Sequence, residues 1–334
     1  MCIRDSFGSV CQGSNPCEVA TSFQPGPVTL PLRPTLPNQS FLMLSGLRTL
    51  LILGRVSNLP TVWTNVSVGW FLSGGGWQTE FASILLGVSL LYIAGMTLND
   101  AFDAKWDKEH GSNRPIPSGR MSLPAVWITG LFEMATGIAV LLLFTSFHLY
   151  LLIGLLAAIL LYNWIHKRWA GSVLIMGACR ALVYAGAGSA VAVHISDIEL
   201  PSLVWVVAFI SVIYIAGLTL AARSEHLKGA KGPGILPRLM LMFPVLFPLL
   251  GSRTIPDSLA NVSLVVVGVI GIWAWVSITR DWLKKRISIG VAYAIAGIAF
   301  YDAAILAFAD WRAAVAALGC FVLTLGAQRV IPAT

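Results

Sequence analysis

Charged side chains are scarce in this chain of 334 residues. Asp, Glu, Lys and Arg make up 11% of it, apolar residues make up 57%, and the mean hydropathy is +0.79. Soluble domains carry about 25% charged residues, so the composition excludes an ordinary soluble protein. Apolar runs of about 20 residues cross a bilayer as helices, and we predict an all-α, polytopic membrane helix bundle of nine to ten transmembrane helices. The runs lie at 57–77, 81–101, 122–145, 147–165, 172–193, 200–222, 237–254, 259–279, 288–309 and 313–329.

Cysteines are also few, and no pair of them has the spacing of a metal site. Three of the five lie near the start of the chain, and the other two, Cys179 and Cys320, lie within predicted helices. The first 40 residues lack the apolar core of a signal peptide and are rich in Pro, Ser and Gly. We predict that residues 1–40 are a disordered extension and that residues 41–334 form the transmembrane domain.

Basic residues are distributed unevenly between the two sets of loops. Fourteen Lys and Arg residues follow the even-numbered apolar runs, whereas only Arg253 and Arg312 lie in the loops of the other side. Basic loops remain in the cytoplasm, so we predict a multi-pass protein of the inner or plasma membrane with a cytoplasmic N-terminus. The net charge of +7 is then a topology signal, and no nucleic-acid partner is needed to explain it. The fourteen are Lys105, Lys108, Arg114, Arg120, Lys167, Arg168, Arg223, Lys228, Lys231, Arg238, Arg280, Lys284, Lys285 and Arg286.

The segment "TLNDAFDAKWDKEHGSNRPIPSGR", residues 97–120, holds four acids and four bases. If the preceding apolar helix continues through it, Asn99, Asp103 and Asp107 recur every four residues, and Asp100 flanks the same face. Carboxylates crowded at a membrane surface repel one another, and Mg²⁺, which prefers oxygen ligands, removes that cost. We predict that Mg²⁺ binds at Asn99, Asp100, Asp103 and Asp107.

The basic turn that follows, "RPIPSGR", predicts what the metal ion would hold. Arg114 and Arg120 can donate fork-shaped hydrogen bonds to phosphate oxygens. A diphosphate bound through Mg²⁺ would explain why the acidic helix face and the basic turn lie next to each other in the sequence. The alternative is an ordinary cytoplasmic loop in which acids balance bases.

These residues resemble a known family. "NDAFDAKWDKEHGSNRPIPSGRMS" resembles the NDxxDxxxD signature of the UbiA superfamily of intramembrane prenyltransferases, and "LGRVSNLPTVWTN" (53–65) and "LYNWIHKRWAG" (161–171) are similar to its first helix and its tyrosine-plus-basic turn. The resemblance implies a UbiA-like bundle around a lipid-accessible cavity that holds a prenyl diphosphate through Mg²⁺. It implies catalytic roles for Asp100, Asp103, Asp107 and Arg114. The substrate-binding residues that it and the charge pattern imply are Asn99, Arg114, Tyr162, Lys167, Arg180, Arg223 and Glu225.

The sequence lacks one part of the family pattern. The second aspartate cluster of the family corresponds to "YIAGLTLAARSEHLKG" (214–229), which contains no Asp, and Glu225 is its only acid. Arg223 would then contact phosphate directly, without a second metal ion. The GxTxxARxE form of this segment is similar to that of the UbiA-like proteins called EboC.

Three interpretations of function follow. The first is a membrane prenyltransferase that moves a prenyl group to an aromatic or other lipophilic acceptor, with aromatic side chains such as Trp63, Trp70, Tyr92, Tyr162 and Trp164 lining the cationic carbon. The second is a non-catalytic prenyl-lipid binding or export component. An unrelated secondary transporter is the third, but its charges would lie at mid-membrane.

Inside the apolar runs, Arg180 faces either the polar site or a structural partner. Glu133 and Asp302 are the acids available to pair with it in the membrane. Prenyl length, the acceptor and the oligomeric state are not encoded in any of these patterns.

Overall fold

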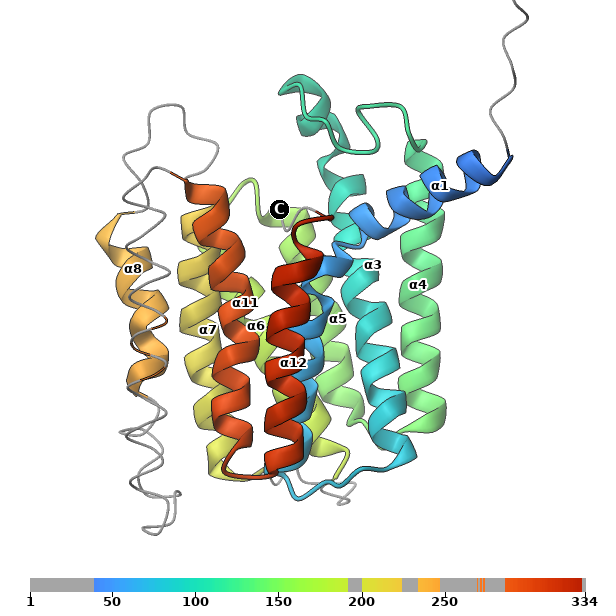
Figure 1. Ribbon diagram of the computed structural model, residues 1–334. Coiled ribbons are helices and arrows are strands. Elements are labelled where there is room, and N and C mark those ends of the chain that lie inside the picture. The colour runs from blue at the N-terminus through green and yellow to red at the C-terminus, as the bar shows by residue number, and fades with distance from the viewer. Residues whose placement is uncertain are drawn as a thin grey trace, which may run out of the picture. The chain divides into compact units, whose positions relative to one another are not determined.

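The computed structural model describes residues 39–191, 200–223, 234–246 and 286–331, together with the single residues 269, 271 and 273. Within these ranges every regular element is helical (Figure 1), which confirms the predicted all-α class. Residues 43–334 form one compact unit. The predicted extension at 1–40 lies almost wholly outside the described residues.

The described helices follow one another through short connections. They are α1 (Gln39–Leu53), the 3₁₀ helix η1 (Val56–Asn58), α2 (Leu59–Leu72), α3 (Thr79–Glu109), α4 (Leu123–Phe144), α5 (Leu149–Ile165), α6 (Ser172–Ser189), α7 (Ser202–Arg223), α8 (Ile235–Met242), η3 (Phe243–Leu246), α11 (Ile287–Leu306) and α12 (Trp311–Ala327). The apolar runs at 81–101, 122–145, 172–193, 200–222 and 288–309 correspond to α3, α4, α6, α7 and α11. Helix α1 was not among the predicted runs.

Five of these helices are long and apolar enough to cross a membrane, namely α3, α4, α6, α7 and α11, and α5 and α12 are shorter apolar helices. The predicted run at 259–279 and most of that at 237–254 lie outside the described residues, so the number of spans stays a prediction. On α4, Ile128, Phe132 and Leu143 are more than two-thirds exposed. Such an apolar surface is suited to lipid.

Helix α2 lies at the centre of the bundle, where it packs against α3, α6, α7, α11 and α12. Its approach to α6 is close because Gly69 has no side chain: a Cβ there would lie 2.1 Å from the carbonyl oxygen of Tyr184. Gly177 of α6 lies in the same way against the backbone of Val212 in α7. Small residues let membrane helices approach backbone to backbone, and here they align the polar side chains of α2 and α6.

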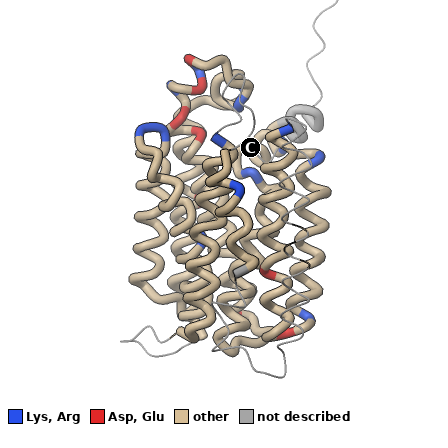
Figure 2. Tube along the Cα trace, turned by 90° about the vertical axis from the view of Figure 1, so that its left-hand side faces the viewer, with Lys and Arg blue, Asp and Glu red and all other residues tan. Residues whose placement is uncertain are grey.

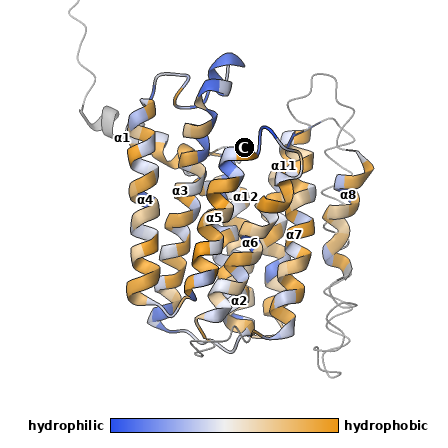
Figure 3. Ribbon diagram, turned by 180° about the vertical axis from the view of Figure 1, so that it is seen from behind, coloured by the Kyte–Doolittle hydropathy of each residue, from blue (hydrophilic) through white to orange (hydrophobic). Residues whose placement is uncertain are grey.

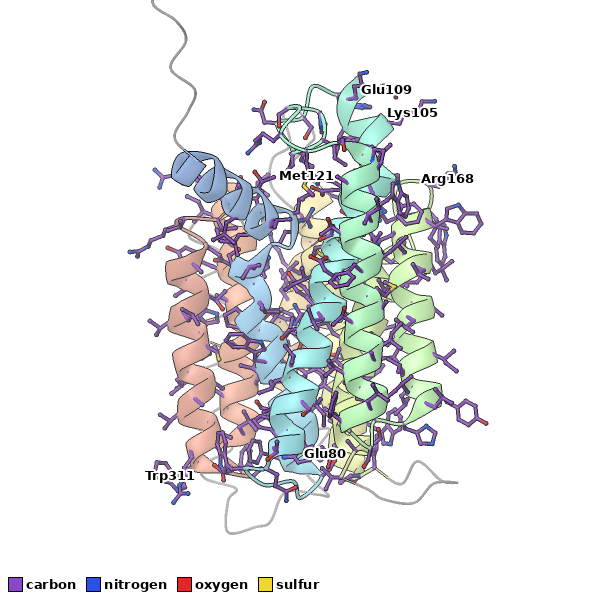
Figure 4. The ribbon with its side chains drawn as sticks, turned by 90° about the vertical axis from the view of Figure 1, so that its right-hand side faces the viewer. Glu80, Lys105, Glu109, Met121, Arg168 and Trp311 are labelled. Atoms are coloured by element: carbon purple, nitrogen blue, oxygen red, sulfur yellow. The ribbon has the colours of Figure 1, made fainter. Side chains whose placement is uncertain are left out.

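Polar and charged residues gather at one end of the bundle. Figure 2 shows most of the described Lys, Arg, Asp and Glu residues there, and Figure 3 shows the hydrophilic connection between α3 and α4 rising above apolar helices. In Figure 4, Lys105, Glu109, Met121 and Arg168 lie at this end, while Glu80 and Trp311 lie at the opposite end. We call the first end the charged end.

Candidate functional site

The last three turns of α3 carry the predicted polar face at the charged end. The helix continues without a break to Glu109, so Asn99, Asp100, Asp103 and Asp107 lie on one side of it. All four are buried, with 5%, 5%, 3% and 3% of their surface exposed. Three carboxylates buried this close together require positive charge beside them.

Arg114 supplies that charge from the loop between α3 and α4. Its Nη1 atom lies 3.1 Å from Asp100 Oδ1, 3.4 Å from Asp103 Oδ2 and 3.1 Å from Asp107 Oδ2. A guanidinium Nη carries two hydrogens, so it cannot donate a separate hydrogen bond to each of three acceptors. The three carboxylate oxygens therefore surround one cationic nitrogen atom. That atom has too few hydrogens to donate a separate hydrogen bond to each oxygen.

Further basic side chains reach the same polar face from other parts of the chain. Lys167 Nζ lies 3.4 Å and His166 Nε2 lies 3.2 Å from Asp103 Oδ2, and both come from the turn between α5 and α6. Arg55 Nη2 lies 3.8 Å from Asp100 Oδ1 and 3.5 Å from Asn99 Oδ1. Lys167 also lies over the ring of Trp106, 3.8 Å from its centroid.

Arg55 reaches this position through an unusual backbone conformation. It follows α1 with φ of 44° and is the only non-glycine residue with positive φ among the described residues. This left-handed conformation costs a non-glycine residue about 1–3 kcal/mol and is enriched at functional sites. The chain turns there from α1 into η1, and Pro60 then lies in the first turn of α2. The strained turn places the guanidinium between the aspartates and the interior of the bundle.

A cavity of about 210 Å³ opens beside the aspartates and extends into the bundle. Most of its wall is apolar, from residues such as Val88, Leu91, Ile159 and Ile295. Arg55 and Arg180 are the only charged residues among the described residues that line it. The aspartates do not line this cavity, but Arg55 and Asn163 of its wall contact Asp100 and Asn99. An apolar chamber beside an acidic cluster suits a lipid that carries a polyanionic head.

Asn163 joins the cavity to the aspartate face. Its Oδ1 accepts a hydrogen bond of 3.1 Å from Asn99 Nδ2, and its Nδ2 donates to the carbonyl of Gly95 at 3.0 Å. Both amides are buried, so this pair fixes α3 against α5. The sequence pattern indicates no role for Asn163, although this residue lies within the tyrosine-plus-basic turn.

The structure brings most of the predicted site residues to the aspartates or to the cavity. Tyr162 lines the cavity and stacks on His166, with ring centroids 5.0 Å apart. Arg180 also lines the cavity, as does Tyr92. Trp63, Trp70 and Trp164, named as aromatic candidates, are not among the described lining residues.

Arg223, which was predicted to contact phosphate, makes three hydrogen bonds to the turn between α5 and α6. It donates to the carbonyl oxygens of Ala170 and His166 and to Ser172 Oγ, at 3.1, 2.9 and 2.7 Å. These bonds hold the end of α7 against the turn that carries His166 and Lys167. It makes no ion pair with the described aspartates, and its contact with phosphate stays a prediction. Glu225 lies outside the described residues.

A second polar cluster is buried in the middle of the bundle. Its members were not grouped together from the sequence. Asp302 of α11, fully buried, accepts hydrogen bonds from Thr64 at 2.6 Å, Asn65 at 2.7 Å and Tyr184 at 2.6 Å. Arg180 donates to Asn65 Oδ1 and, at 3.0 Å, to Thr61. The expected direct pair between Arg180 and an intramembrane acid is thus replaced, among the described residues, by contact through Asn65. The partners come from α2, α6 and α11, which are far apart in the sequence, so no local pattern could have indicated the cluster.

The donor set at α3 fits a divalent cation. Its carboxylate and amide oxygens are the ligands that Mg²⁺ prefers, and three carboxylates already converge on one cationic point. Within the described residues no group of three or more His, Cys, Asp or Glu side chains is arranged as a ready metal site. Because Mg²⁺–oxygen distances are about 2.0–2.1 Å, Arg114 has to leave and the carboxylates have to close in before a metal ion fits.

Comparison with known families supports the assignment that these motifs indicated. Residues 60–283 match the UbiA prenyltransferase family. The chain belongs to the UbiA prenyltransferase family. Membership, together with the apolar helices, makes it an integral membrane protein. The more specific likeness of residues 217–225 to EboC stays a prediction.

Two solved structures share the UbiA fold with this chain. A UbiA homolog from Aeropyrum pernix K1 is similar with a TM-score of 0.60 at 17% identity, over 75% of this chain and 96% of that one. A digeranylgeranylglyceryl phosphate synthase is similar with a TM-score of 0.57 at 18% identity, over 79% of this chain and 98% of that one. At this identity the likeness shows the fold alone. A comparison with curated proteins found no match.

Proposed function

We propose that this UbiA family member is a membrane prenyltransferase that moves a prenyl group from a Mg²⁺-bound prenyl diphosphate to a lipophilic acceptor. The observation that carries the proposal is the convergence of Asp100, Asp103 and Asp107 on one cationic position beside an apolar cavity. The head of the ligand would lie at the aspartates and its chain in the cavity.

The polar side chains of the aspartate face and the basic residues beside it each have a physical role in this reaction. Asn99 and the three aspartates would hold Mg²⁺, which when bound neutralises negative charge on the diphosphate. Arg114, released from the carboxylates, would donate to phosphate oxygens, joined by Arg55 and Lys167. Charge on a departing diphosphate grows as its bond to carbon breaks, so these fixed cations stabilise the transition state more than the ground state.

The cavity wall is suited to the prenyl carbon that gains positive charge as the diphosphate leaves. The rings of Tyr92 and Tyr162 line it, and aromatic faces attract a carbon that gains positive charge. The apolar residues around them keep water, a competing nucleophile, away from that carbon. The acceptor then supplies the nucleophile.

A second candidate is a prenyl-lipid binding or export component on the same fold. The absence of any Asp at 214–229 favours it, as does the use of Arg223 to hold a backbone turn. In this case the diphosphate binds at the same aspartates without transfer.

One assay tests both candidates. Protein in lipid nanodiscs is mixed with farnesyl or geranylgeranyl diphosphate, Mg²⁺ and a panel of lipophilic acceptors, and diphosphate release and prenylated product are measured beside binding. Product supports the transferase, whereas tight Mg²⁺-dependent binding without product across the panel supports the binder.

The double change Asp100→Ala/Asp103→Ala is expected to weaken Mg²⁺-dependent binding at least tenfold under either candidate. Glu109→Gln is the matched control, because Glu109 is an exposed acid at the end of the same helix. Unaltered binding by the double variant would rule out the proposed site.

A further inference from the structure

The cavity beside the aspartates is surrounded by a ring of described helices. Its lining residues come from Arg55, from Asn58 of η1, and from α2, α3, α5, α6, α7 and α11. Each helix of this ring packs against the next: α3 against α5, α5 against α6, α6 against α7, α7 against α11, α11 against α2, and α2 against α3. A lipid chain that enters the cavity from the charged end is therefore surrounded by protein.

The cavity has nearly the same depth along every long helix of the ring. Its lining residues fall within 88–96 on α3, 155–163 on α5, 176–183 on α6, 215–222 on α7 and 291–298 on α11. Each of these ranges covers seven or eight helical steps, which correspond to about 10–12 Å at 1.5 Å per residue. The cavity therefore ends at one level inside the bundle.

Packed side chains close the cavity at that level. One turn beyond the lining residues, Ile84 of α3, Leu152 of α5 and Ala187 of α6 are at most 1% exposed and are not among the described lining residues. On the far side of this level α2 approaches α6, where a Cβ at Gly69 would lie 2.1 Å from the carbonyl oxygen of Tyr184. Protein interiors are close-packed, so extra carbon atoms fit there only at the cost of strain.

The depth and the volume of the cavity indicate the same capacity. An isoprene unit adds four carbon–carbon bonds of about 1.5 Å to a prenyl chain, which span roughly 5 Å when extended. A depth of about 12 Å therefore holds two units. The volume is about 210 Å³, and because an apolar cavity of about 150 Å³ holds benzene, this one holds roughly eight to ten carbon atoms. Both values match a geranyl chain.

We propose that the cavity accepts a prenyl chain of two isoprene units, so that geranyl diphosphate is the prenyl diphosphate that fits this site. The identification rests on the proposed function, in which the diphosphate lies at the aspartates. Farnesyl and geranylgeranyl diphosphate still bind through their diphosphate, but their remaining carbons have to displace buried side chains or stay outside the cavity. Val88 and Leu155 are the lining residues of α3 and α5 at the closed end, and they set this limit.

The order of affinities in the wild-type protein is the first test. Dimethylallyl, geranyl, farnesyl and geranylgeranyl diphosphate are titrated with Mg²⁺ by calorimetry in detergent micelles, and each affinity is corrected for partition into micelles without protein. We expect geranyl diphosphate to bind about tenfold or more tighter than dimethylallyl diphosphate, because it buries more apolar surface. It should bind about five- to a hundredfold more tightly than farnesyl diphosphate, because overpacking is costly. Affinity that rises with every added unit would overturn the proposal.

Leu155→Ala is the second test, because it removes apolar atoms from the closed end. The space left behind should raise the affinity for farnesyl relative to geranyl diphosphate about fivefold or more over the wild-type ratio, and partition into micelles cancels in this comparison. Leu141→Ala is the matched control, since Leu141 of α4 is fully buried and α4 contributes no described residue to the cavity wall. Thermal unfolding midpoints check that both variants fold. An unchanged ratio in Leu155→Ala would contradict the proposal.

Val88→Phe makes the opposite change. The larger side chain is expected to lower the affinity for geranyl diphosphate about tenfold or more and to leave that for dimethylallyl diphosphate unchanged, because a single isoprene unit ends before it reaches Val88. An equal loss for both ligands would show that Val88 does not limit chain length.

The two proposals fail in different ways. If none of the four diphosphates binds with Mg²⁺, the proposed function is rejected, and geraniol and farnesol then test the cavity through the same ratio in wild type and Leu155→Ala. If all four bind without a preference for two isoprene units, the limit on chain length is rejected and the aspartate site remains.

Discussion

Under the proposed function, Mg²⁺ would compete with Arg114 for the same three carboxylate oxygen atoms. In the structure the negative charge of Asp100, Asp103 and Asp107 is balanced by Arg114, with Arg55 and Lys167 beside them. A metal ion therefore has to displace Arg114, and a diphosphate gives the displaced guanidinium new oxyanions to bind. The two ligands are expected to favour each other's binding, because each one removes part of the cost of the other.

Arg114→Gln tests this competition. Without diphosphate, the variant is expected to bind Mn²⁺ about tenfold more tightly than the wild type, because the carboxylates lose a competing cation. Its affinity for farnesyl diphosphate should fall about ten- to a hundredfold. Electron paramagnetic resonance of Mn²⁺ gives the first affinity and calorimetry the second. Arg120→Gln is the control for Mn²⁺, since Arg120 donates to Ser118 and the Asn113 carbonyl in the same loop. Equal Mn²⁺ affinity in wild type and Arg114→Gln would contradict the competition.

At the scale of helices, the polar network depends on how closely α2 and α6 approach. Thr61 and Asn65 come from α2, whereas Arg180 and Tyr184 come from α6. Gly69 lies between the two helices, where any Cβ would meet the Tyr184 backbone at 2.1 Å. The sequence shows Gly69 only as one of 31 glycines, and the packing gives it a role.

We expect Gly69→Ala to destabilise the protein by about 1–3 kcal/mol or more, because the added methyl group forces two backbones apart. The thermal unfolding midpoint in detergent measures the effect. Gly319→Ala in α12 is the matched control, since a Cβ at that exposed position meets no atom within 4 Å. It should be neutral or slightly stabilising, because Ala has the higher helix propensity. Equal midpoints for the two variants would show that α2 and α6 do not pack as described.

For the whole molecule, the distribution of charge predicts orientation. The described loops after α3 and α5 lie at the charged end, and the positive-inside rule predicts that this end is in the cytoplasm. Gln78 and Lys108 are exposed residues that flank α3 at its two ends.

Single cysteines at these positions in a background without native cysteines test the orientation. A membrane-impermeant maleimide added to intact cells is expected to label Gln78→Cys, and to label Lys108→Cys only after the membrane is opened. The reverse pattern would place the aspartates on the outer face and invert the predicted topology.

Much of the fold and part of the site could be predicted from the sequence, because both depend on local periodicity. Apolar runs predicted α3, α4, α6, α7 and α11, and the four-residue spacing placed Asn99, Asp103 and Asp107 on one side of a continuous helix. Helix α1 was missed, since it lies next to the polar extension and was not counted as a run. A phosphate contact for Arg223 was inferred from its place in a motif and stays a prediction, whereas its hydrogen bonds to the turn between α5 and α6 could not be inferred from the sequence.

Composition and spacing by themselves determined that this protein is a helical membrane protein with an acidic face at one end of α3. Those properties follow from hydropathy and helical period, which act over neighbouring residues. Only the tertiary structure decided that Arg114 lies among the aspartates, that Arg55 and Arg180 share one cavity, and that Asp302 reaches Arg180 through Asn65. These contacts join residues as far apart as 237 positions, and their geometry depends on how closely helices pack.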